Sequence, residues 1–146
     1  METNDNYEET SENYFNKPSL ILRVKSMMID SLVIIILMYL ASILLNYLEI
    51  ESGNVRGIVM VLVLLYEPIF VTINRTVGQK IMGLRVIKFS EFVSSGNRIN
   101  INIANSFVRF MGKITLGWIS LLTIHSNEYG QAIHDKLGNS IMTIKK

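Results

Sequence analysis

The chain has 146 residues, enough for one domain, of which 49% are hydrophobic, and its mean hydropathy is +0.34. It contains no cysteine, which excludes disulfides and thiolate metal sites. Its first 16 residues carry five acids and no Lys or Arg, so a net charge of +2 conceals a basic body. Basic residues around apolar blocks indicate contact with anionic lipid headgroups rather than with nucleic acid.

The N-terminal residues, 1–17, are expected to form an acidic disordered tail, because such polar segments cannot bury enough apolar surface to fold. They also lack the basic start and the small-residue cleavage site of a secretory signal peptide. Residues 18–146 are expected to form a membrane domain.

Two apolar blocks predict a transmembrane helical hairpin. The first, residues 27–48, begins MMIDSLVIIILMYLASILL and spans roughly 33 Å as a helix, enough to cross a hydrocarbon core. The second covers residues 57–74. A connector of about ten residues joins them, so the two helices are expected to be antiparallel neighbours.

Basic residues predict the orientation of this hairpin. The connector has one, Arg56, beside Glu49 and Glu51, whereas basic residues are frequent on both outer flanks. Because Lys and Arg accumulate on the cytoplasmic side, both ends of the hairpin and the N-terminus are expected to be cytoplasmic.

Alternating apolar and polar residues predict strands over 84–89 and 98–103, with the turn signal SSGN between them. The tail, residues 140–145, is a candidate third strand. We therefore expect a small cytoplasmic β element that begins as a β-hairpin.

The third apolar block, residues 104–124, leaves two alternatives open. It is long enough to cross the membrane, but it contains Arg109 and Lys113. A crossing would also separate the tail from the strand over 84–89, whereas a re-entrant or interfacial path would let them pair. The predicted fold is thus a mainly α membrane protein with a helical hairpin, a third membrane helix (spanning or re-entrant) and a small β element.

Three polar residues, Asp30, Glu67 and Arg109, are expected to form a polar layer within the membrane. Counted along antiparallel helices, they lie at similar depth, roughly 7 to 10 Å below the cytoplasmic surface. Pro68 removes a helix hydrogen bond and frees the carbonyl of Leu64, and a carbonyl beside a carboxylate suits a hard cation.

Arg23 lies two helical turns before Asp30 and therefore on the same helix face. We expect Arg23 to reach the headgroups while Asp30 faces the bundle interior. Two roles for the intramembrane charges remain open: holding the helices in register, or carrying ions or protons.

A glycine-containing segment, GQKIMG (78–83), lacks the Lys and Ser/Thr of a phosphate-binding loop and is not expected to bind nucleotides. Gly78 is instead expected to end the second helix. The following residues Lys80, Arg85 and Lys88 predict a basic loop on the membrane surface.

Catalytic and metal sites are not expected. The adjacent pair His134–Asp135 has no nucleophile pattern near it, and a helix cap or polar contact explains it better. His125 and His134 do not have metal-ligand spacing, so no metal, cofactor or enzyme activity is predicted.

These residues together resemble the RDD family of small bacterial membrane proteins, which is named for an arginine before the first transmembrane helix, an aspartate within it and a later aspartate. Arg23, Asp30 and Asp135 match the three positions, in RVKSMMIDSL and QAIHDKLGNSIMTI. The stretch TVGQKIMGLRVI is similar to the family's TxGKxxxGLRVV segment. The resemblance covers residues 18–146, and Glu67 also falls where many members carry an acid.

The resemblance implies a multi-pass protein of the bacterial inner membrane, in a family whose members have in part been associated with sodium/proton antiport. The first hypothesis is a small transporter or transport subunit that exchanges a monovalent cation for protons through Asp30 and Glu67, with a homo-oligomer or a membrane protein partner. The alternative is a non-transporting accessory or scaffold that binds a partner or anionic lipid through its basic loop.

Overall fold

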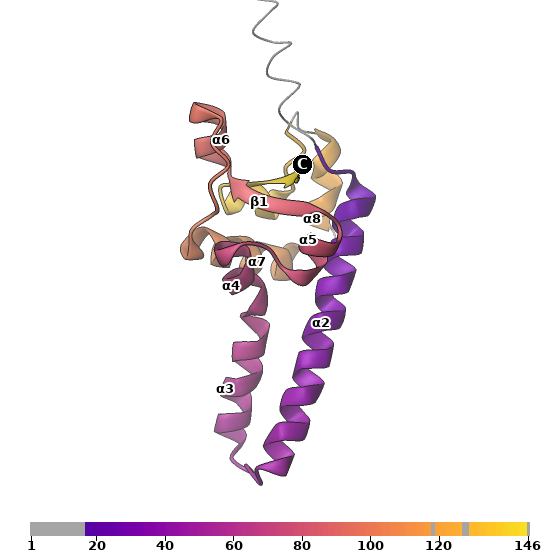
Figure 1. The fold of residues 1–146 in the computed structure, drawn as a ribbon, viewed down its shortest axis with the longest axis vertical. Helices are drawn as coiled ribbons and strands as arrows, with labels where there is room; N and C mark the ends of the chain where they lie inside the picture. The colour runs from indigo at the N-terminus through magenta and orange to yellow at the C-terminus, as the bar shows by residue number, and fades with distance from the viewer. Residues whose placement is uncertain (1–16, 118, 127–128, 146) are drawn as a thin grey trace, which may run out of the picture.

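Two long helical segments dominate the computed structural model, which describes residues 17–117, 119–126 and 129–145. The first is α2 (Leu20–Tyr47), and the second consists of α3 (Gly53–Leu64) followed by α4 (Tyr66–Ile73). They run side by side in opposite directions and are joined at one end by a short connector (Figure 1). We refer to these three helices as the helix pair.

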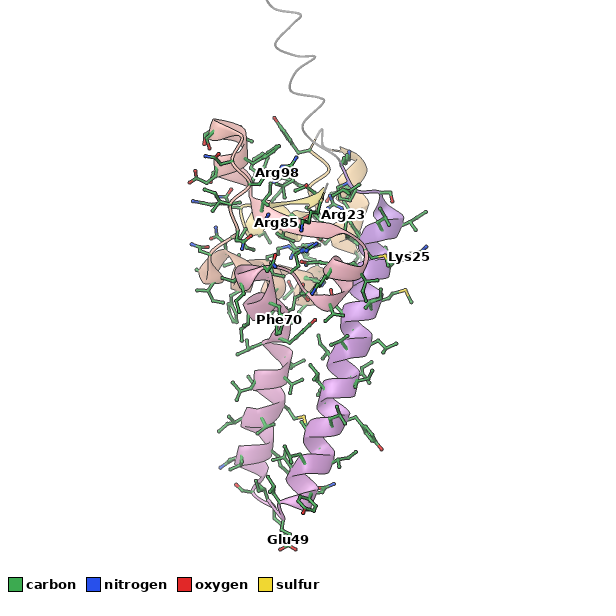
Figure 2. The ribbon with its side chains drawn as sticks, viewed as in Figure 1. Arg23, Lys25, Glu49, Phe70, Arg85 and Arg98 are labelled. Carbon is green, nitrogen blue, oxygen red and sulfur yellow. The ribbon has the colours of Figure 1, made fainter. Side chains whose placement is uncertain are left out.

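Both segments of the helix pair are long and apolar enough, by length and composition, to cross a membrane. Few of their apolar side chains are buried. Along α2 and α3 many side chains project outward from the two helices (Figure 2). The core helix of a soluble protein would bury these side chains, so their exposure favours a lipid environment.

The first helix begins seven residues before the predicted apolar block, at Leu20. The side chain of Ser19 caps it by accepting a hydrogen bond from the N–H of Leu22 at 3.4 Å. These added residues, about two turns of helix, carry Arg23 and Ser26, which are buried against the rest of the chain. They therefore belong to the folded end of the molecule and not to the apolar stretch that hydropathy detects.

The predicted second helix, 57–74, is in fact two. It begins at Gly53 and is interrupted at Leu65, between α3 and α4. Pro68 lies in the first turn of α4, where its missing N–H costs little. In an unbroken helix its ring would clash with the carbonyl of Leu64, four residues earlier.

The remaining elements gather at the end of the helix pair away from the connector, and we call them the cap (Figure 1). They are α5 (Val77–Ile81), β1 (Leu84–Lys88), α6 (Phe89–Ser95), α7 (Ile103–Leu116), α8 (Ile119–Leu122), the 3-10 helix η1 (Thr123–Ser126), α9 (Ile133–Leu137) and β2 (Ser140–Ile144).

The two strands form an antiparallel sheet in which Leu84 pairs with Ile144 and Lys88 with Ser140. Its buried face packs against a residue of α4, and the resulting core consists of Val71, Leu84, Val86, Ile101 and Met142. The tail thus pairs with the first predicted strand, as the third strand of the predicted element was expected to do.

The predicted strand over 98–103 is not a strand, and the predicted β-hairpin does not form. The residues after β1 turn into α6, which ends at Gly96 with a φ of 68°. One backbone hydrogen bond joins this segment to β1, from the N–H of Lys88 to the carbonyl of Ile99 at 2.9 Å, but the strand that pairs with β1 along its length is β2. The alternation of this segment places Ile101 in the core while Ile99 stays exposed.

The third apolar block does not form the single helix expected over 104–124. The helix α7 has 14 residues, about 21 Å, and ends at Gly117, which has a φ of 51°. Among the described residues, two helical segments are long enough to cross a membrane, and α7 is not one of them. Of the predicted acidic tail, residues 1–16 lie outside the described residues.

Candidate functional site

The most buried charged group of the cap is the carboxylate of Asp135, in α9. Its Oδ2 atom accepts a hydrogen bond from Nη1 of Arg23 at 3.1 Å, and its Oδ1 atom accepts one from Nε of Arg109 at 2.8 Å. The backbone N–H of Ala132 donates to Oδ2 at 3.3 Å. One fully buried carboxylate therefore ties together α2, α7 and the start of α9.

This carboxylate stays ionised despite its burial. Burial alone would raise the pKa of Asp135, but the neighbouring positive charges, foremost that of Arg109, outweigh burial and lower the pKa to about 2. Two arginines around one carboxylate leave one positive charge in excess, and Arg109 also lies near a second carboxylate.

Glu67, in the first turn of α4, is that second carboxylate. Its two carboxylate oxygens accept hydrogen bonds from Nζ of Lys113 at 2.7 and 2.8 Å. Nη1 of Arg109 lies 4.0 Å from its Oε1 atom. Arg109 therefore stands between Asp135 and Glu67. We call these two acids, together with Arg23, Arg109 and Lys113, the charge cluster.

The structure brings Glu67 and Arg109 together, as the depth argument predicted. Sequence reasoning missed that Lys113 is the direct partner of Glu67, because it treated this lysine only as a charge opposing a membrane crossing. The signal was present: Lys113 follows Arg109 by four residues and so lies on the same face of α7.

Arg23 does not reach outward as expected. Its side chain is 1% exposed, and its Nε and Nη2 atoms have no hydrogen-bond partner among the described residues. The expectation was wrong because the C-terminal part of the cap covers this face of α2, so that Arg23 meets Asp135. A buried guanidinium needs such a counter-charge.

Asp30 serves a different contact from the one expected. It is buried, and its Oδ2 accepts a hydrogen bond from the hydroxyl of Thr76 at 2.7 Å, while its Oδ1 accepts one from the N–H of Gly78 at 2.8 Å. Asp30 thus caps the start of α5 and fastens that helix to α2. The missed signal is the capping box formed by Thr76 and Gln79.

Gly78 does not end the second helix; it is the second residue of α5. A Cβ atom at this position would lie 2.2 Å from the carbonyl oxygen of Ser26 and 2.9 Å from the Asp30 carboxylate. Only glycine permits this close approach of α5 to α2, so the TVGQ segment is built to receive the Asp30 side chain.

The charge cluster and Asp30 are not arranged as a cation site. Every carboxylate oxygen of Asp30, Glu67 and Asp135 already accepts a hydrogen bond from a protein donor. In the part of the chain that the structure describes, no group of three or more His, Cys, Asp or Glu side chains could hold a metal ion. The arrangement gives each buried carboxylate its donors and joins α2, α4, α5, α7 and α9 to one another.

A Ser–His–Asp contact in the cap resembles a catalytic arrangement but lacks access. The hydroxyl of Ser120 accepts from the N–H of His134 at 3.2 Å, and its oxygen lies 2.5 Å from Nδ1 of the same residue. Nε2 of His134 lies 3.5 Å from Oδ1 of Asp135. All three side chains are buried, and burial lowers the pKa of His134 to about 4, so the neutral imidazole links α8 to α9.

The predicted basic loop is divided between two elements. Lys80 is exposed on α5, whereas Arg85 and Lys88 lie on β1 and donate to Asn100 and Glu91, respectively. Exposed basic residues nevertheless cover more of this end of the molecule than that loop. On the cap they include Lys80, Arg98, Lys136 and Lys145, and beside it, before and on α2, they include Lys17 and Lys25. Three acids of this end, Asp30, Glu67 and Asp135, are buried.

No protein-family model, curated protein or solved structure matches the chain. Fold and site define its class by themselves: two helical segments able to cross a membrane, and a basic cap that buried ion pairs fasten to one end of them.

Proposed function

We propose that this protein is a two-span integral protein of the bacterial inner membrane, with the helix pair as a transmembrane hairpin and the cap in the cytoplasm. The distribution of charge supports this orientation. The connector end carries Glu49, Glu51 and Arg56, whereas the end that carries the cap exposes basic side chains and buries Asp30, Glu67 and Asp135.

Within the membrane we assign it a non-transporting accessory function: it holds a basic cap against the cytoplasmic leaflet, where the cap meets a partner or anionic lipid. One observation carries this proposal. The carboxylates that would have to bind a transported cation are already saturated by internal donors, Glu67 by Lys113 and Asp30 by Thr76 and Gly78. Their geometry is that of fasteners between segments.

Cation/proton exchange is the second candidate, and the position of two acids favours it. Asp30 and Glu67 are buried side chains on helices able to cross the membrane, and Glu67 binds a cationic group, Lys113, that a cation could replace. Two membrane helices cannot enclose a pathway, so this function requires a homo-oligomer or a membrane protein partner.

Membership of the RDD family is part of the proposal. It is supported by the placement of the three residues that carry the resemblance. Arg23 and Asp135 form a buried ion pair, and Asp30 lies two turns further along the same helix, fastening α5. Residues in such contacts are constrained in the way that a family signature requires.

Proton flux in proteoliposomes tests the two functions against each other. Purified protein is reconstituted, a sodium or potassium gradient is imposed, and an internal pH dye reports exchange, with an added ionophore as positive control. The accessory function predicts no flux above that of empty vesicles. Flux in the wild type that is lost in both Asp30→Asn and Glu67→Gln, but kept in the exposed-site variant Lys136→Gln, would replace it with exchange.

A further inference from the structure

The helix α7 has its polar and apolar faces reversed relative to a surface helix of a soluble protein. Its polar side chains Ser106 and Arg109 are buried, and Lys113 is turned inward to Glu67. Five of its large apolar side chains are exposed by 38 to 60%, namely Ile103, Phe107, Val108, Met111 and Ile114, whereas one, Phe110, is buried. A helix of this length normally buries its apolar face and hydrates its polar one.

The charge cluster enforces this reversal. Arg109 must face α9 to reach Asp135, and Lys113 must face α4 to reach Glu67. Gly112, on the same inward side, would bring a Cβ atom to 3.3 Å from that of His134, so α7 packs closely on α9 there. Because the polar side of α7 faces α4 and α9, its apolar side faces outward.

The position of α7 continues the apolar surface of the helix pair. It runs across the end of α4, at the junction between the long helices and the cap (Figure 1). Exposed Ile69, Phe70 and Ile73 extend the apolar surface along α4, and Ile81 adds to it from α5. Figure 2 shows Phe70 at this junction.

From this geometry we infer that α7 lies in the membrane–water interface as a lipid-bound helix, with its apolar face among the acyl chains of the cytoplasmic leaflet. The inference rests on the proposed membrane insertion of the helix pair. With 14 residues, α7 is too short to cross, but its apolar face is suited to the acyl-chain boundary. The exposed lysines of the cap, such as Lys80, complement anionic headgroups.

This surface thus has one occupant, the bilayer itself. Two kinds of contact then hold the cap at the membrane. Ion pairs attach it to the helix pair, and the apolar side chains of α7 and its neighbours insert into the leaflet. The arrangement explains how α7 exposes an apolar face and carries two cations, Arg109 and Lys113, on its inward side without crossing the membrane.

The inference is tested by measuring the membrane depth of fluorescent labels on single introduced cysteines. The chain has no cysteine of its own, so only the introduced one is labelled. Single cysteines are introduced at Phe107→Cys and Ile114→Cys on α7, at Ile36→Cys on α2, and at Lys136→Cys as a cap control. All four side chains are exposed, so no buried contact is lost. Each variant carries the fluorophore NBD in vesicles of phosphatidylcholine and phosphatidylglycerol, with nitroxide groups at shallow or deep acyl positions.

The expected result is that both α7 labels are quenched at least twofold more strongly by the shallow nitroxide than by the deep one. The Ile36 label should show the opposite preference, and the Lys136 label should be quenched by aqueous iodide. Equal shallow depth at positions 107 and 114 means that the helix lies parallel to the surface.

Three outcomes overturn the inference while leaving the membrane insertion of the helix pair intact, because each is scored with a deeply quenched Ile36 label. In the first, the α7 labels are open to iodide. In the second, iodide and nitroxide both fail to quench them, so protein covers α7, either a second copy or a partner. In the third, the label at position 114 lies at mid-membrane depth, so α7 enters as a crossing segment. An Ile36 label open to iodide overturns the proposed function and, with it, the inference.

Discussion

Arg23 and Asp135 are 112 residues apart in the sequence, yet Nη1 of one lies 3.1 Å from Oδ2 of the other in a fully buried ion pair. The helices α2 and α9, the first and the last of the described residues, are thereby joined. Because Arg109 binds the other oxygen of the same carboxylate, Asp135 also joins α7 to α9.

Replacing that acid should destabilise the protein more than any exposed charge substitution. Asp135→Asn leaves the guanidinium groups of Arg23 and Arg109 buried without their counter-charge, and we expect the free energy of unfolding to fall by about 3 to 5 kcal/mol. Chemical unfolding in detergent, followed by circular dichroism, measures it.

The matched control is Glu91→Gln, which breaks the partly exposed Lys88–Glu91 pair and should cost less than about 1 kcal/mol. A loss of that same size in Asp135→Asn would show that the cluster does not hold the cap. The double variant Arg23→Gln/Asp135→Asn should lose less than the sum of its single changes, since both remove one interaction.

Gly78→Ala should loosen the contact of α5 with α2. The added methyl group would stand 2.2 Å from the Ser26 carbonyl oxygen, which is backbone and cannot turn aside, so α5 must move. We expect a loss of about 1 to 3 kcal/mol, the range of overpacked core substitutions, measured by thermal unfolding. Gly57→Ala is the control: it meets nothing within 4 Å and should be neutral or stabilising in a helix. Equal behaviour of the two variants would contradict the contact.

His134 should make stability fall in mild acid. Burial lowers its pKa to about 4, against 6.5 for an ordinary histidine, so between these values the unfolded chain binds a proton that the folded protein excludes. Stability is therefore fully present above about pH 6.5 and declines toward pH 4, at most by about 1.4 kcal/mol per pH unit.

The groups facing this imidazole are Asp135, Arg109, Lys113 and Glu67. The stabilising ionisation of Asp135 is lost at lower pH, below its ordinary value of 3.8 and toward about 2, so the two effects fall in separate windows. Unfolding curves between pH 7.5 and 4.5 measure the slope. In His134→Gln the slope should become shallower, and an unchanged slope would assign it to another group.

The orientation of the hairpin can be read from two single cysteines. Ser52→Cys lies in the connector and Lys145→Cys near the C-terminal end of the cap, both exposed. In intact spheroplasts an impermeant maleimide should label position 52 and leave position 145 unlabelled, and inverted vesicles should reverse the pattern. Labelling of both positions from one side would exclude the proposed topology.

The positions of the long helices and of the two strands could be predicted from the sequence. Apolar length marks α2 and the α3–α4 segment, alternation marks β1, and the tail is a candidate strand where β2 lies. The alternation of 98–103 misled because one buried residue, Ile101, is enough to produce the pattern without a strand. The block 104–124 misled because apolar composition does not reveal the break at Gly117.

Hydropathy and charge are local properties, so the apolar stretches, the collections of basic residues and the candidate pair Arg109 and Glu67 can be found without a structure. The tertiary structure decided the partners. Arg23 turns inward to Asp135, Lys113 takes Glu67, and Asp30 caps α5. The physical reason is that a buried charge takes the counter-charge or donor that packing brings within about 3 Å. That choice depends on how distant segments meet, which spacing along the chain does not encode.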